Sequence, residues 1–312
     1  MLFSDTKKSR KISMKFIKKI LIPFDFSEPS FNALNYGIKM ANKFDAKIDL
    51  LCHINDKVYN MSNNLVDKDL SFSTSEKLKK TDENIQKIIQ RPDCVDLVDT
   101  YTVKSGDEIK NIIEHEKKNS IDFVIVGAFE TNTSDREKLV RLSICPVIIV
   151  KHFCSFDEGI KHILFASDFD KNTPTIANFL KLFTSVLQAQ IHLLRINTWE
   201  NFLHSSQSEQ RMLKFKARNG LNKCTLNVYD HSIVEEGIME FTSKINIDLL
   251  ALVTHGRSQI SQWFSPSVTE ELVHRINAIP IITFNIEIEN RKEYIIKPLP
   301  QQNQDSKLKG TE

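Results

Sequence analysis

The stretch that decides the fold is residues 20–27, ILIPFDFS, which returns in outline at residues 163–170 as ILFASDFD. Each copy is an apolar run that leads to an aspartate, Asp25 in the first and Asp168 in the second. Two later landmarks recur in the same order: IDFVIV at residues 121–126 returns as IDLLAL at 247–252, and CPVIIV at residues 145–150 returns as IPIITF at 279–284. A repeat of this length indicates a duplicated domain, because the units of solenoid proteins are much shorter.

Short apolar runs alternate with helical patterns in both copies. Strands are predicted at residues 17–24, 47–54, 94–103, 121–127 and 147–150 in the first copy, and at 163–167, 190–196, 224–229, 249–254 and 281–284 in the second. Helices are predicted from Ser27, over 77–89, around 109–116 and over 136–142, and then around 176–187, around 234–245 and over 268–276. Such alternation is typical of parallel sheets covered by helices. The chain is therefore predicted to be an α/β protein of two fused, doubly wound parallel-sheet domains.

Length and composition set the expected boundaries. The chain has 312 residues, which suits two domains of ordinary size. We expect the domains at residues 15–152 and 160–286, joined by a linker at 153–159. The basic start of the chain, residues 1–14, is predicted to be a flexible arm, and the polar end, residues 287–312, a disordered tail.

Charge and cysteine content exclude several kinds of partner. The net charge of +2 offers no large basic field, so neither nucleic acid nor an anionic membrane is expected as a partner. No run of about 18 apolar residues is present that could span a membrane. The five cysteines are scattered and odd in number, which favours a reducing compartment and a cytoplasmic location. No metal site is expected, because Cys145, His152, Cys154 and His162 lack the tight paired spacing of a zinc site.

Candidate binding residues fall where predicted strands end. Asp25 and Gly127 do so in the first copy, and Asp168 and the pair His255 and Gly256 do so in the second. In open α/β sheets, ligands bind beyond the carboxyl ends of the strands, at the point where the strand order reverses. The sequence therefore predicts a binding region at this edge of each sheet.

The second copy carries a turn, residues 254–258 (THGRS), followed by residues 266–270 (PSVTE). With the strand-aspartate opening and the proline-led closing strand, this arrangement resembles the universal stress protein family. Members of that family carry Gly-x-x-Gly after a strand, then nine residues and Gly-Ser/Thr at the start of a helix. The resemblance covers both copies and implies a tandem member with the adenine-nucleotide-hydrolase-like fold, arranged as a pseudo-dimer.

The resemblance also implies a ligand. Glycines let backbone N–H groups approach a phosphate, the next helix offers its positive N-terminal end, and the aspartate can bond a ribose hydroxyl. ATP, with Mg²⁺, is the candidate ligand, and no other cofactor is expected. The candidate pocket of the second copy consists of Ala166, Ser167, Asp168, Ile196, His255, Gly256, Ser267, Val268 and Thr269. Asp25 and Gly127 would form a remnant pocket in the first copy.

The sequence departs from the family pattern at the phosphate loop. In the second copy, Val253 and Pro266 replace two of the motif glycines, and proline lacks an N–H donor. In the first copy the loop is shorter, and Glu130 stands where a second glycine would be. A carboxylate at that place would repel phosphate. We therefore expect a degenerate nucleotide pocket, confined at best to the second copy.

The candidate residues also have plainer interpretations. Each aspartate could order its own turn instead of holding a ribose. His255 is read as a turn residue, because no nucleophile with a placed base accompanies it. The expected function is that of a cytoplasmic stress-response protein acting as a binding or interaction module, with no catalytic residues. An adenine-nucleotide sensor and a weak ATPase stay as the alternatives.

The last strands give the expected assembly. The strands from Val147 to Val150 and from Ile281 to Phe284 are short, β-branched edge strands, which must be covered or paired. Single-domain relatives pair in this way as dimers, so fusion would make the contact intramolecular. We expect the two copies to pair through these strands and the module to bind a protein partner of unknown identity.

Overall fold

A computed structural model describes residues 17–54, 74–127, 133–151, 159–170, 174–254, 271–273, 275–276 and 278–285. The arm predicted at 1–14 and the tail predicted at 287–312 lie outside these ranges, as does the predicted linker except for residue 159. The chain divides into two compact units, Met1–Gly127 and Ala128–Glu312.

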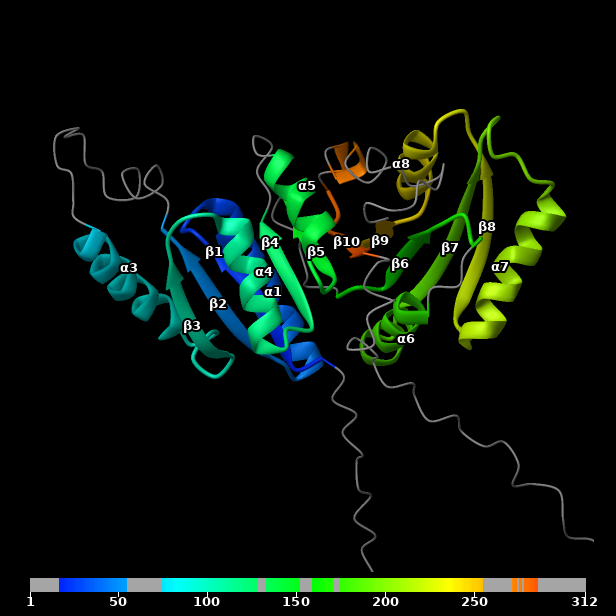
Figure 1. Cartoon of the computed structure of the whole chain (residues 1–312). Coiled ribbons are helices and arrows are strands. Elements are labelled where there is room, and N and C mark those ends of the chain that lie inside the picture. Colours follow the sequence, from blue (N-terminus) through cyan, green and yellow to red (C-terminus); the bar gives the residue numbers. More distant parts are fainter. Residues whose placement is uncertain are drawn as a thin grey trace, which may run out of the picture. The chain divides into compact units, whose positions relative to one another are not determined.

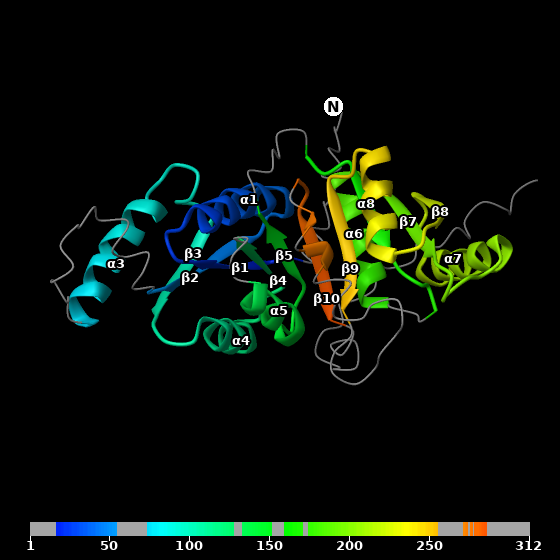
Figure 2. The ribbon, with the colours of Figure 1, turned by 90° about the horizontal axis from the view of Figure 1, so that it is seen from above.

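Unit 1 holds a parallel sheet of four strands (Figure 1). Its strands are β1 (Lys19–Phe24), β2 (Lys47–His53), β3 (Val98–Lys104) and β4 (Phe123–Gly127), in the order β3-β2-β1-β4. Its helices are α1 (Glu28–Phe44), α3 (Thr74–Ile89) and α4 (Glu108–Asn119), and α1 and α4 cover opposite faces of the sheet (Figure 2). The chain builds outward from β1 to β3 and then returns to the other side of β1, so the strand order reverses between β1 and β4.

Unit 2 repeats this order. Its parallel strands are β6 (His162–Ala166), β7 (Gln190–Asn197), β8 (Cys224–Asp230), β9 (Leu249–Thr254) and β10 (Ile281–Asn285), in the order β8-β7-β6-β9-β10. β5 (Val147–Val150) is antiparallel to β10, with Ile148 opposite Ile282. Its helices are α5 (Thr133–Leu142), α6 (Pro174–Leu187), α7 (Ser205–Asn219) and α8 (Val234–Lys244). The order reverses between β6 and β9, which are the counterparts of β1 and β4.

Helix α1 forms where the sequence predicts it, for the expected reasons. Ser27 is its N-cap and accepts a hydrogen bond from the backbone N–H of Ser30, and Pro29 lies in the first turn, where its missing N–H costs nothing. The helix ends at Phe44, and its C-cap Asp45 adopts the left-handed conformation with a φ of 53°.

The repeated Ile-Asp landmark fixes the start of the first strand in each unit. Asp122 accepts hydrogen bonds from the backbone N–H groups of Lys18 and Lys19, at 2.6 and 2.9 Å. Asp248 does the same for Lys161 and His162, at 2.7 and 2.8 Å. Burial raises the pKa of Asp122, and the two N–H groups partly offset that rise. The landmark therefore has a structural role in both units.

Three predicted boundaries and one element need correction. The first strand begins at Lys19 and not at residue 17, the strand predicted at 94–103 is Val98–Lys104, and the strand predicted from residue 121 begins at Phe123. Helix α7 was not predicted at all, because its buried face mixes Met212 and Phe215 with the polar Ser208 and Asn219. Of the helix predicted at 268–276, residues 271–273 and 275 are helical, residue 276 is not, and residues 268–270 and 274 lie outside the described ranges. No helix in the described part of the chain is long and apolar enough to cross a membrane.

Candidate functional site

The two strand-end aspartates stand at the reversal points of the two sheets, where a ligand of an α/β fold is expected. Each orders a turn of the same form. Asp25 Oδ1 accepts from the backbone N–H of Ser27 at 3.0 Å, and Asp168 Oδ1 accepts from that of Asp170 at 3.1 Å. The residue between them is a phenylalanine with positive φ in both cases, 65° at Phe26 and 55° at Phe169. The plainer interpretation of both aspartates is thus correct for one carboxylate oxygen, while the other oxygen has lone pairs for a ligand hydroxyl.

The turn of Asp168 is fixed from several sides. Ser167 Oγ accepts from the backbone N–H of Phe169 at 3.2 Å. The ring of Phe169 is buried and packs edge-on against Phe165 and Phe215, with ring centroids 5.7 and 5.4 Å away. This packing holds the left-handed residue in place, which offsets the cost of its conformation. The backbone around Asp168 is therefore ordered by the core beneath it.

A buried arginine lies under this turn. Arg195, on β7, is 2% exposed and donates from Nη1 to the carbonyl oxygen of Asp168 at 2.9 Å and from Nη2 to that of Asn201 at 3.0 Å. Burial and the neighbouring charge of Arg211 lower the pKa of Arg195 to about 10, so the side chain is still charged at neutral pH. Sequence reasoning missed Arg195. The available signal was a charged residue inside the apolar run of a buried strand.

Unit 1 differs at both corresponding places. Cys52 lies opposite Phe24 on β2, where Arg195 would lie in unit 2, and it is fully buried. Burial raises the pKa of the Cys52 thiol far above its ordinary value. A Cβ on Gly127 would lie 1.9 Å from the carbonyl oxygen of Pro29. Gly127 is therefore needed for the contact between β4 and the first turn of α1, whatever else it does.

The other predicted pocket residues of unit 2 have mixed positions. Ala166 and Ile196 are fully buried, and Ile196 lies against Gly237 of α8. Ser167 and Asp168 are half-buried at the strand end, and Val253, in place of a motif glycine, is buried at the end of β9. The remaining predicted residues lie outside the described ranges: His255, Gly256, Ser267, Val268 and Thr269, together with Pro266 and Glu130.

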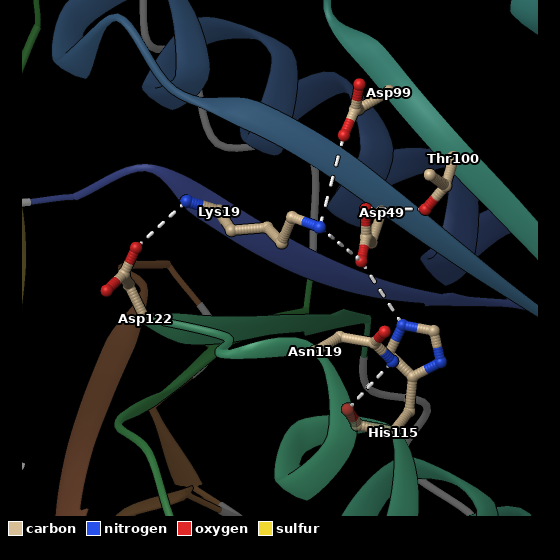
Figure 3. Close-up of polar contacts among 7 residues, drawn as sticks. All are labelled: Lys19, Asp49, Asp99, Thr100, His115, Asn119 and Asp122. Carbon is tan, nitrogen blue, oxygen red and sulfur yellow. Dashed lines mark hydrogen bonds and ion pairs between the residues drawn. The ribbon is translucent and has the colours of Figure 1, made fainter. Parts of the chain in front are cut away.

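A second polar cluster lies nearer the amino ends of the strands in unit 1 (Figure 3). Asp49 is 1% exposed and accepts from Thr100 Oγ1 at 2.6 Å, while His115 Nε2 and Lys19 Nζ lie 3.3 and 3.5 Å from its Oδ2. Burial acts to raise the pKa of Asp49, but the hydrogen bonds of His115 and Thr100 and the charge of Lys19 outweigh it and leave the pKa lowered. This cluster was not predicted from the sequence.

Unit 2 carries different residues at the same positions. His162 and His192 replace Lys19 and Asp49, and Thr225 replaces Thr100. His162 Nδ1 lies 3.1 Å from His192 Nε2, and His192 Nδ1 lies 2.9 Å from Thr225 Oγ1. Burial and the charge of His162 lower the pKa of His192. An ion pair in one unit is thus replaced by a histidine pair in the other.

The cysteines and histidines of the described residues form no metal cage. No group of three or more His, Cys, Asp or Glu side chains there could hold a metal ion. Cys145 is buried next to Ser143, whose hydroxyl lies 3.8 Å from its sulfur, and His162 faces His192. Cys52, Cys94, Cys145 and Cys224 are thiols and are not joined in disulfides.

Two units of parallel α/β architecture, each with an aspartate turn at its reversal point, define a tandem doubly wound protein. The model of the universal stress protein family matches residues 17–151 and 159–278, and the chain therefore belongs to the universal stress protein family. The first match ends after β5, a strand that belongs to unit 2 by its packing.

Solved structures agree with this fold. A universal stress protein from Archaeoglobus fulgidus DSM 4304 is 17% identical, with 87% of this chain and 98% of that chain covered and a TM-score of 0.67. A putative universal stress protein from Pseudomonas aeruginosa UCBPP-PA14 is 16% identical, with 88% and 96% covered and a TM-score of 0.59. Among curated proteins, none matches the chain significantly.

Proposed function

We propose that this chain is a binding module without turnover, with a single adenine-nucleotide site at the carboxyl ends of β6 and β7 in unit 2. The observation that carries the proposal is the turn of Asp168 at the reversal point of the sheet. One carboxylate oxygen holds the turn, and the other can accept a ribose hydroxyl from a ligand lying over the strand ends. Family membership supports a nucleotide as that ligand.

The charges around Asp168 suit an anionic ligand. Arg211 Nη1 lies 3.0 Å from Asp170 Oδ1, and the guanidinium of Arg195 lies beneath Asp168. Two cations therefore offset the two carboxylates of the turn, so the turn does not repel a phosphate. The oxygen ligands that Mg²⁺ prefers are also present in Asp168 and Asp170. The phosphate loop itself lies outside the described residues, so the proposal rests on the ribose end of the site.

The absence of turnover rests on the groups around the turn. The hydroxyl of Ser167 accepts a hydrogen bond from its own turn, and no imidazole within the described ranges lies in hydrogen-bond contact with it. A serine without a base is a weak nucleophile. Pro266 lacks a backbone N–H donor, and Val253 adds a side chain where the backbone should approach the phosphate closely, so we expect weak binding.

The proposal also covers location and partners. Three buried cysteines in the described part of the chain form no disulfide, which supports a reducing compartment, and we propose the cytoplasm. We further propose that the two repeats pair through β5 and β10, a pairing supported by the antiparallel ladder between these strands. A protein partner of unknown identity would bind to this module.

The test is to purify the protein without added ligand, release bound small molecules with heat, and identify them by chromatography. Titration with ATP, AMP and GTP, with and without Mg²⁺, then gives affinities. We expect an adenine nucleotide to bind with a Kd above about 1 μM and no multiple-turnover hydrolysis. If no adenine nucleotide binds at millimolar concentration, the proposed nucleotide site is overturned and only the role as a protein-interaction module remains. Sustained hydrolysis of ATP would instead support the weak ATPase.

A further inference from the structure

We infer that Arg195 is the positioning residue of the site in unit 2, because its guanidinium ties the Asp168 turn to the loop that follows β7. This inference rests on the proposed nucleotide site for its ligand role. The mechanical tie between the two loops can be tested without any ligand.

The geometry of the guanidinium sets the positions of the two loops. Its two terminal nitrogens each donate to a backbone carbonyl, that of Asp168 at 2.9 Å and that of Asn201 at 3.0 Å. The guanidinium is planar, so the directions of these donors are fixed relative to each other. Bonds from a charged donor are also stronger than neutral ones. The carbonyls of Asp168 and Asn201 are therefore held at a set separation.

The far end of the same loop is held separately. Asn197, at the end of β7 and 3% exposed, donates from Nδ2 to the carbonyl oxygen of Leu203 at 3.2 Å and to Asp230 Oδ1 at 3.0 Å. Arg195 and Asn197 thus both hold residues 198–203, and of these two side chains it is Arg195 that also bonds Asp168. Trp199, which is 92% exposed, lies on this loop.

Burial makes the tie strong. A charged side chain that is 2% exposed costs free energy unless its donors are used, so loss of the guanidinium leaves two carbonyls without their charged donor. The position in unit 1 that corresponds to Arg195 is Cys52, which has no comparable fork of donors. The tie therefore distinguishes the site of unit 2 from its counterpart in unit 1.

The experiment compares Arg195→Met, Arg195→Gln and Arg195→Lys in the full chain. Met removes all donors at similar volume, Gln keeps a neutral donor, and Lys keeps the charge. Asn197→Ala is the matched control, because it loosens the far end of the loop without touching Asp168. Amide hydrogen exchange of residues 167–170 and 198–203, thermal unfolding and the Kd for ATP and AMP are measured for each variant.

We expect Arg195→Met to speed exchange in both segments by about tenfold or more and to raise the nucleotide Kd by a similar factor. Arg195→Lys should restore part of both effects, and Asn197→Ala should speed exchange near residue 203 but not at 167–170. If Arg195 had only a structural role, all three variants would lower the unfolding temperature. Exchange would then not rise together in residues 167–170 and 198–203, and Arg195→Lys would behave like Arg195→Met.

Unchanged exchange at residues 167–170 in a folded Arg195→Met variant would overturn the tie. Faster exchange with an unchanged nucleotide Kd would overturn the ligand role. A native chain that binds no adenine nucleotide would instead overturn the proposed function, together with the ligand role, and the exchange result would still decide the tie. If Arg195→Met does not fold, the Gln and Lys variants decide both questions by the same measurements.

Discussion

At the scale of single residues, Gly127 ends β4 where the backbone touches the first turn of α1. Gly127 was predicted from the sequence to belong to a remnant nucleotide pocket, and that binding role stays a prediction. Its packing role is visible, because a Cβ there would overlap the backbone of Pro29 at 1.9 Å. A clash with backbone cannot be relieved by a rotamer change.

Gly127→Ala should therefore destabilise unit 1, by about 1–3 kcal/mol or more. Gly220→Ala serves as the contrast: its φ is 60° but no atom lies within 4 Å of the added Cβ, so only backbone strain of about 1 kcal/mol is expected. Urea unfolding of both variants measures the difference. Equal costs would show that the Pro29 contact relaxes easily.

At the scale of elements, local signals predicted most of the fold. Ser27 with Pro29 predicts the start of α1, and apolar runs predict the buried strands β1, β4, β6 and β9. Helix α7, which was not predicted, has polar residues on its buried face, and these weaken the helical periodicity of its apolar residues. Arg195 could not be assigned a role from sequence, because its two carbonyl partners become neighbours only when β6 and β7 pair.

The same limit applies to the polar clusters on the strands. Asp49 and His192 occupy equivalent positions on β2 and β7, yet their partners come from other strands and, for Asp49, from α4. Because these residues lie far apart in the sequence, their contacts cannot be predicted from sequence patterns. Only the register of the paired strands brings Lys19 to Asp49 and His162 to His192.

The histidine pair predicts a pH dependence for unit 2. The folded-state pKa of His192 is lowered, whereas the unfolded chain titrates near its ordinary value of 6.5. Below that value the unfolded state binds more protons, so stability is full above about pH 6.5 and falls as the pH drops toward the folded pKa. The charge that acts on His192 comes from His162 on β6, and its other hydrogen-bond partner, Thr225 on β8, is uncharged. The carboxylate of Asp248 bonds the backbone N–H of His162.

Amide exchange of β6 and β7, measured between pH 7.5 and 5.5 and corrected for the intrinsic pH dependence of exchange, tests this pair. Protection should decrease on acidification in the native chain. His192→Asn keeps a hydrogen-bonding group opposite Thr225 but cannot titrate, so its protection should change much less. An equal loss of protection in both proteins would assign the acid response to other groups.

At the scale of the whole molecule, the proposed pairing of the repeats rests on β5 and β10. Ile148 is fully buried and lies opposite Ile282 in the antiparallel ladder. Ile148→Asp would bury a carboxylate without a partner and should cost about 3–5 kcal/mol. Val95→Asp, at a site that is 57% exposed, should cost little.

Thermal unfolding and analytical ultracentrifugation of both variants check this prediction. A drop in the unfolding temperature confined to Ile148→Asp, or a change in its association state, is the expected result. A stable, monomeric Ile148→Asp protein would count against pairing through these strands.

The central claim is that one repeat binds and the other does not, and the matched pair Asp168→Ala and Asp25→Ala tests it. Both variants lose the same turn-closing hydrogen bond, so their folding costs should match and any difference in binding belongs to the ligand. Calorimetric titration with ATP and Mg²⁺ should show at least about tenfold weaker binding for Asp168→Ala and less than about twofold change for Asp25→Ala. Equal losses in the two variants, or a loss in Asp25→Ala alone, would contradict the assignment of the site to unit 2.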